Sequence, residues 1–126
     1  MTNGRKLLLI AAAVFVVEMA FAPLYGYHRD ELYFLAAGRH PAWGYVDQPP
    51  LTPMIARLSE TLFGNSLYGL RLVPALIAAG TVVMAGLLTK EFGGESRAQV
   101  LAAVAIAGSS LFLMLGHLLS TATIDA

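Results

Sequence analysis

The sequence contains no cysteine and few charged residues. Without cysteine, the chain has no disulfide, no thiolate ligand for a metal ion and no cysteine nucleophile. Charged residues make up 13% of the 126 positions, about half of the share that is typical of soluble domains, whereas 57% of the residues are hydrophobic. Eight basic residues balance eight acidic ones, so no excess positive charge indicates a nucleic-acid partner. This composition predicts a protein that is embedded in a lipid bilayer.

Three hydrophobic runs are long enough to cross a bilayer, since a spanning helix needs about 20 apolar residues. They cover residues 7–25, 67–89 and 98–119. The first run follows two basic residues, and Ala20-Phe21-Ala22 near its end resembles a cleavage site, so a cleaved signal peptide is the alternative to a membrane anchor. The length of this run, and Pro23 directly after the expected cut, favour the anchor. We therefore predict an all-α polytopic membrane protein with three transmembrane helices.

The connection between the first two runs, residues 27–66, is expected to hold one or two short helices. The stretch "RDELYFLAAGRHP" predicts a helix that ends at Gly38 and Pro41. The stretch "PMIARLSETLFG" predicts an amphipathic helix with Pro53 in its first turn, and such a helix beside membrane spans is expected to lie along the interface. Three prolines between Pro49 and Pro53 predict a stiff turn between the two helices.

Three consecutive spans alternate in direction, and this assigns the polar segments to sides. The N-terminus and the hairpin "KEFGGESR" are expected on one side of the membrane, and the loop 27–66 and the end "TATIDA" on the other. The second side then collects the acidic residues Asp30, Glu31, Asp47 and Asp125. Lysine and arginine in the short segments of the first side favour the cytoplasm for it, so the acidic side is expected to be extracytoplasmic.

Asp30 and Glu31 follow the first span directly, where the head group of a lipid-linked substrate would emerge. A carboxylate at this place can act as the general base on an acceptor hydroxyl. Transfer outside the cytoplasm needs an activated donor carried by the membrane, and the sequence has no glycine-rich phosphate loop. The alternative is that both acids only begin a helix. For Glu31, an orienting or pairing role, with Arg29 or Arg39 as candidate partners, is favoured over direct chemistry.

Three further polar residues lie within or beside the predicted spans. Glu18 is expected to face the bundle interior or a cavity, either as a hydrogen-bonded structural group or on a substrate path. His117 is expected to be hydrogen-bonded rather than a ligand. Arg71, at the start of the second run, is expected to extend its charged end to the membrane surface, and contact with a lipid phosphate is the alternative.

Several stretches resemble a known family of membrane enzymes. "HRDELYF", "WGYVDQPPLTPMIARLSETLFGNSLYGLRLVPAL" and "TATIDA" are similar, in order and spacing, to the start of glycosyltransferase family 39 proteins. These enzymes include dolichyl-phosphate-mannose–protein mannosyltransferases and lipid A aminoarabinose transferases. The resemblance covers about residues 7–126, and its motifs are specific together rather than singly. Relatives are much longer, so we expect the chain to be the N-terminal part of one such transmembrane domain, inactive on its own.

The resemblance implies a GT-C fold and a transfer reaction. Such enzymes move a hexose or pentose from a polyprenyl-phosphate donor to a hydroxyl acceptor, which the sequence does not identify. By position, Asp30 matches the catalytic aspartate and Glu31 its acidic partner. The positions that match substrate-binding parts of the family are Asp47, Pro49, Pro50 and Asp125. Gln48 stands where many relatives have histidine. The expected location is the bacterial cell membrane, with the active-site loop outside.

Two other interpretations remain open at this level. His28 and His40 together with Asp30 leave room for a divalent metal ion, although no certain cofactor is indicated. The chain is alternatively a non-catalytic membrane protein, such as a transporter fragment or an assembly subunit, whose acidic loop only caps helices. Transporters usually place polar breaks near mid-membrane, whereas here the acidic cluster is at the interface and only Glu18 lies inside a span. This distribution favours the transferase.

Overall fold

A computed structural model describes residues 2–124, and all regular secondary structure in this range is helical. The predicted all-α class is therefore confirmed. The elements are α1 (Asn3–Phe21), α2 (Arg29–Arg39), α3 (Leu51–Phe63), α4 (Leu67–Glu91), α5 (Ser96–Ala107), α6 (Ser110–Gly116) and α7 (Thr121–Ile124). Both helices predicted for the loop are present, and Pro53 lies in the first turn of α3 as expected.

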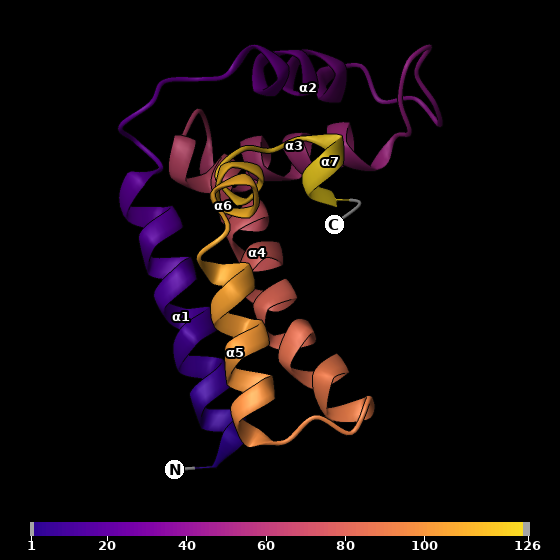
Figure 1. Ribbon diagram of the computed structural model, residues 1–126. Coiled ribbons are helices and arrows are strands. Elements are labelled where there is room, and N and C mark those ends of the chain that lie inside the picture. Colours follow the sequence, from indigo (N-terminus) through magenta and orange to yellow (C-terminus); the bar gives the residue numbers. More distant parts are fainter. Residues whose placement is uncertain (1, 125–126) are drawn as a thin grey trace.

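Helices α1, α4 and α5 lie side by side and form a bundle, whereas α2 and α3 lie across one end of it (Figure 1). The start of α1 and the turn between α4 and α5 are at the opposite end, where the Ser96 hydroxyl donates a hydrogen bond to the Asn3 side chain. Short elements α6 and α7 lie at the same end as α2 and α3. The structure thus places the polar segments at the two ends that alternating spans predict.

Among the described residues, α4 is the one helix that is long and apolar enough to cross a membrane. Helix α1 has 19 residues but carries Arg5, Lys6 and Glu18. The third hydrophobic run is not one continuous helix, because α5 ends at Ala107 and α6 starts at Ser110. Three transmembrane helices therefore remain a prediction.

The break between α5 and α6 has a local cause in the sequence. Gly108 is a poor helix former, and the hydroxyl of Ser109 accepts a hydrogen bond from the backbone N–H of Phe112. Ser109 thereby acts as the N-cap of a new helix, whose axis turns away from that of α5 (Figure 1). This turn places α6 against α4 and brings His117, at the end of α6, to Glu18 of α1.

Small and aliphatic side chains fill the contact between α1, α4 and α5. Its buried members are Leu7, Ala11, Val14, Ala78, Val82 and Ala103. Gly86 on α4 lies directly against Leu7, because a Cβ atom at this position would come within 2.5 Å of a leucine methyl group. Close approach through glycine and alanine is the usual way in which helices pack inside membranes.

Helix α3 buries its small residues and exposes its large apolar ones. Thr52, Pro53, Ala56 and Ser59 face the rest of the protein. Met54, Leu58 and Leu62 on the other side are more than half exposed, at 52%, 56% and 65%. A helix with this distribution, lying across the end of the bundle, fits the predicted position along a membrane interface.

Candidate functional site

Helix α2 begins with a capping box that involves both members of the acidic pair. The backbone N–H of Asp30 donates to Nδ1 of His28 at 3.3 Å, and the backbone N–H of His28 donates to Oε2 of Glu31 at 2.9 Å. Such reciprocal bonds satisfy backbone donors that a helix start leaves free. The cap orients Asp30 and Glu31 on the first turn, with Glu31 fully buried and Asp30 half exposed.

The Glu31 carboxylate is bound on all sides. Nε of Arg71 donates to Oε1 at 2.9 Å, and Nη2 donates to Oε2 at 2.8 Å. The backbone N–H of Leu119 also donates to Oε1, at 3.4 Å, and that of His28 binds Oε2. Because an ionised carboxylate has about four acceptor sites, these four bonds leave Glu31 no free one. This favours an orienting role over direct chemistry.

The predicted partners of Glu31 pair with other carboxylates. Nε of Arg29 lies 3.5 Å from Oδ1 of Asp30 at the surface. Nη2 of Arg39 lies 2.5 Å from Oε1 of Glu60 and thereby joins α2 to α3. The prediction that Arg29 or Arg39 neutralises Glu31 is therefore wrong, because a buried arginine from α4 takes this place.

Arg71 is buried, with 1% of its surface exposed. The prediction that it extends to the membrane surface is therefore wrong. Its guanidinium points inward, because it binds Glu31 and the chain that leaves α1. The carbonyl oxygens that accept from it belong to Ala22, Tyr25 and Gly26, at 2.6, 3.0 and 2.9 Å. Arg71 thus ties the end of α1 and the start of α2 to α4.

His117 and Glu18 extend this arrangement into the bundle. Nε2 of His117 lies 3.3 Å from Nη1 of Arg71, and its Nδ1 lies 3.2 Å from Oε2 of Glu18. Since a guanidinium only donates, Nε2 accepts from Arg71, and Nδ1 carries the proton and donates to Glu18. Four side chains from α1, the end of α6, α4 and α2 are thereby connected in the order Glu18, His117, Arg71, Glu31. The predictions of an inward-facing Glu18 and a hydrogen-bonded His117 are confirmed.

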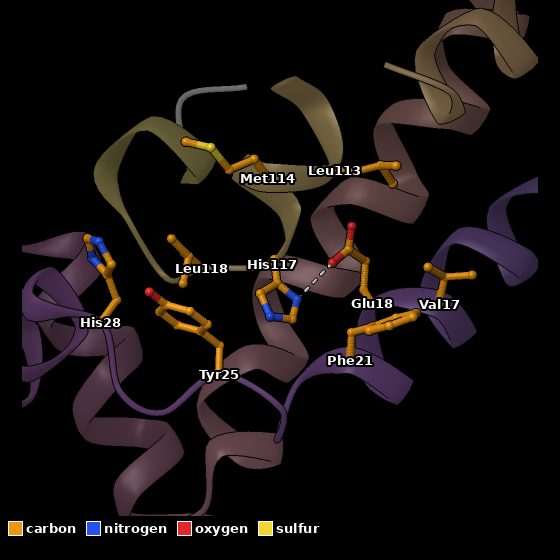
Figure 2. A pocket seen from close by; sticks show the side chains of 9 residues that line it. All are labelled: Val17, Glu18, Phe21, Tyr25, His28, Leu113, Met114, His117 and Leu118. Carbon is orange, nitrogen blue, oxygen red and sulfur yellow. Dashed lines mark hydrogen bonds and ion pairs between the residues drawn. The ribbon is translucent and has the colours of Figure 1, made fainter. Parts of the chain in front are cut away.

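A groove of about 480 Å³ runs along Glu18 and His117 (Figure 2). It is lined by Val17, Glu18, Phe21, Tyr25, His28, Leu113, Met114, His117 and Leu118. Tyr25 and His28 lie on the far side of His117 from Glu18. Nδ1 of His28 is 3.8 Å from Oδ2 of Asp30, so one end of the groove lies beside Asp30.

Asp47 joins the exposed face of α2 through a tyrosine. The Tyr33 hydroxyl donates a hydrogen bond of 2.8 Å to Oδ1 of Asp47, and this bond raises the pKa of Tyr33 above its ordinary value. Tyr33 follows Asp30 by three residues, so the two are neighbours on one helix face. The structure thus brings Asp47 to the side of α2 that carries Asp30.

The other predicted substrate-binding positions have fewer contacts. Pro49 is exposed, and Pro50 is the residue from which α3 starts. The neighbouring Gln48 contacts α7, because its Oε1 lies 3.5 Å from the Thr121 hydroxyl. Asp125 is outside the described residues. The turn before α3 therefore lies beside α7, and its role in binding stays a prediction.

The three groups considered for a divalent metal ion are not brought together. His28 precedes the 11-residue helix α2 and His40 follows it, so the two are 12 residues apart, or about 18 Å at 1.5 Å per residue. Nδ1 of His28 is already used by the Asp30 backbone. Within residues 2–124, no three His, Cys, Asp or Glu side chains are placed to hold a metal ion.

Sequence comparison identifies the family of this chain. Residues 47–126, more than half of the chain, match the family model described as dolichyl-phosphate-mannose-protein mannosyltransferase. No curated protein and no solved structure matches. The matched segment includes Arg71 and His117 but starts after Asp30 and Glu31. The chain belongs to the dolichyl-phosphate-mannose-protein mannosyltransferase family.

Proposed function

We propose that the complete enzyme transfers a sugar from a polyprenyl-phosphate donor to a hydroxyl acceptor on the extracytoplasmic side of the membrane, with Asp30 as the general base. Family membership indicates a membrane glycosyltransferase. The family description names a donor, dolichyl-phosphate mannose, in which a lipid phosphate carries the sugar. This is the class of donor that a reaction outside the cytoplasm requires.

The difference between Asp30 and Glu31 carries the assignment of the base. All acceptor sites of Glu31 are occupied by hydrogen bonds inside the protein, whereas the side chain of Asp30 is 48% exposed. Among residues 2–124, the Asp30 carboxylate has ion-pair contacts only with Arg29 and His28, at 3.5 and 3.8 Å. Of the two acids, Asp30 is therefore the one with acceptor capacity for a substrate proton.

The proposed reaction forms one bond at the anomeric carbon of the sugar and breaks another, with Asp30 as the proton acceptor. Asp30 accepts the proton of the acceptor hydroxyl, whose oxygen forms a bond to the anomeric carbon of the sugar. The bond between that carbon and the phosphate oxygen breaks, and the lipid phosphate leaves with the electron pair. Attack from the face opposite the phosphate inverts the anomeric carbon. In this proposal Asp47 and the turn at Pro49 and Pro50 flank the substrate on the same side of α2.

The arrangement of the helices supports the proposed orientation. The end of the bundle that carries α2 and α3 is the end with Asp30, and the exposed apolar side of α3 suits the boundary of a bilayer. The basic residues Arg5, Lys6, Lys90 and Arg97 belong to the opposite end, which favours the cytoplasm for that end. We place these helices in a GT-C fold, which the family resemblance implies.

Substitution Asp30→Asn tests the proposal in the complete enzyme. The assay uses tritiated dolichyl-phosphate mannose as the donor, with a serine- and threonine-containing peptide and a membrane-lipid extract as acceptors in separate reactions. We expect turnover to fall by about 10²–10⁴-fold, the usual contribution of a general base. The matched control is Glu95→Gln, an exposed acid at the other end of the bundle, which keeps its turnover. Turnover near wild type in Asp30→Asn would remove Asp30 from the mechanism.

A further inference from the structure

We propose that Glu18 and His117 are positioning residues for Asp30, which act through Arg71 and Glu31. This inference rests on the proposed function, because it concerns the placement of the same base. Its starting point is the buried connection from Glu18 to Glu31, in which each side chain contacts the next at 2.8–3.3 Å. Neither Glu18 nor His117 contacts Asp30, so both act at a distance.

Arg71 is the centre of this connection, because one rigid guanidinium holds two chain segments. Its five N–H groups face both oxygens of Glu31, the Nε2 atom of His117 and three backbone carbonyls between α1 and α2. The two N–H groups of Nη1 face three of these acceptors. A rotation of the guanidinium plane therefore shifts several contacts together, including those that hold the first turn of α2.

His117 fixes the plane of Arg71 from the side of α6. Its Nε2 is an acceptor at the edge of the guanidinium that does not face Glu31. If this acceptor is lost, Nη1 keeps only the carbonyls of Ala22 and Tyr25, which both belong to the connection that leads to α2. We expect the guanidinium to turn toward these carbonyls, and the Glu31 carboxylate to follow it.

Glu18 determines which nitrogen of His117 carries the proton. Its Oε2 accepts from Nδ1, so Nε2 presents a lone pair to Arg71. Without Glu18 the imidazole is free to carry its proton on Nε2, and two donors would then face each other. Gly116 makes room for the carboxylate, because a Cβ atom there would lie 3.2 Å from Oε1 of Glu18 and 2.8 Å from Cβ of Ala78.

The displacement reaches Asp30 because Asp30 and Glu31 are adjacent on the first turn of α2. Their capping box links the backbone N–H of His28 to Glu31 and that of Asp30 to His28. A shift of the Glu31 carboxylate thus moves the backbone that carries Asp30. Misplacement of a catalytic group by about 1 Å costs on the order of 10²-fold in rate, which makes the effect measurable.

Paired substitutions separate positioning from general stability. In His117→Gln the side-chain amide reaches the place of Nε2 and offers an acceptor to Arg71, whereas in His117→Asn it reaches only the place of Nδ1. We expect kcat with dolichyl-phosphate mannose to stay close to wild type in His117→Gln and to fall roughly 10- to 100-fold in His117→Asn, with KM for the donor unchanged. Glu18→Gln, which keeps an acceptor for Nδ1, should likewise retain kcat, and Glu18→Leu should lose it.

A second measurement does not depend on activity. Hydrogen exchange of the backbone N–H groups of His28 and Asp30 should become faster in His117→Asn and Glu18→Leu, and stay at the wild-type rate in His117→Gln and in the groove-wall control Met114→Leu. Equal kcat and equal exchange in wild type, His117→Asn and Glu18→Leu would overturn the inference, and so would equal losses in the Asn and Gln variants. If Asp30→Asn is active, the proposed base is wrong, whereas the exchange rates still decide whether Glu18 and His117 hold α2.

Discussion

Glu31 and Arg71 form a two-bonded ion pair inside the protein, although they are 40 positions apart in the chain. Glu31 is fully buried and Arg71 is 1% exposed, so neither charge is shared with solvent. The pair connects the first turn of α2 with the first turns of α4, the helix that is long enough to span a membrane. The position of the acidic residues is therefore tied to the bundle and not to the loop alone.

Removal of one partner of this pair should destabilise the protein strongly. Glu31→Gln leaves the guanidinium of Arg71 buried without a counter-charge, and breaking a buried ion pair in this way costs roughly 3–5 kcal/mol. The free energy of unfolding in detergent micelles, measured by denaturant titration, checks the value. A loss below about 1 kcal/mol, the usual upper value for an exposed pair, would show that the buried pair is not formed.

The exposed pair of Arg39 and Glu60 serves as the control for this prediction. Its arginine side chain is 61% exposed, so Arg39→Met should lower the free energy of unfolding far less than Glu31→Gln does. The contrast between Glu31→Gln and Arg39→Met separates the effect of burial from the effect of removing a charge.

Much of the fold was predictable because the helices carry local signals. The prolines border the two loop helices, and the apolar runs mark α1 and α4. Gly38, predicted to end the first loop helix, instead lies inside α2, which continues to Arg39. The division of the third run was not predicted, although Gly108 followed by two serines is a recognisable stop and N-cap. A hydropathy pattern averages over such a break, since the residues on both sides of it are apolar.

The candidate site was predictable only in part. Asp30 and Glu31 stand out by their place after an apolar run, but the role of Arg71 depends on the direction in which its side chain points. An arginine in the first turns of an apolar helix has the same sequence pattern whether it reaches the membrane surface or the interior. Alternating spans do place Arg71 and Glu31 at the same end of the bundle, and this relationship was the available signal for their pairing.

Close contact between α2 and α3 should depend on Gly38. A Cβ atom at this position would lie 2.6 Å from the carbonyl oxygen of Pro53 and 3.2 Å from Cβ of Arg57, so Gly38→Ala forces the two helices apart. We expect a loss of about 1–3 kcal/mol in the free energy of unfolding, as for other overpacked sites. Gly44→Ala is the matched control, because nothing lies within 4 Å of a Cβ atom there. Equal stability of the two variants would contradict the contact.

The ion pair of Arg39 and Glu60 should make a small contribution to the free energy of unfolding, and this contribution should depend on pH. The hydrogen bond from Arg39 lowers the pKa of the Glu60 carboxyl below its ordinary value of 4.5. Since the folded pKa is below the unfolded one, the pair contributes its full stability above about pH 4.5 and loses it as the pH falls through the folded value.

The contribution is measured as the difference in the free energy of unfolding between wild type and Glu60→Gln, at neutral pH and at a pH below 4.5. The difference between the two proteins should be present at neutral pH, shrink on acidification and shrink in high salt, because the pair is exposed. A difference that grows on acidification would show that Arg39 does not hold the carboxylate. Glu91→Gln, which removes an exposed acid from the end of α4, is the control for the loss of one surface charge.

The orientation in the membrane is testable with two matched aromatic positions, because the chain has no cysteine of its own. Trp43, between α2 and α3, is 95% exposed, and Phe92, between α4 and α5, is 89% exposed, so neither substitution disturbs the core. In intact cells, Trp43→Cys should react with a membrane-impermeant maleimide, and Phe92→Cys should react only after the membrane is permeabilised. Phe92 is expected in the cytoplasm because basic residues lie beside it, and positively charged short segments stay in the cytoplasm.

Labelling of Phe92→Cys alone from outside would show the opposite orientation, with Asp30 in the cytoplasm. Labelling of both from outside would show that the helices between them do not cross the membrane an odd number of times.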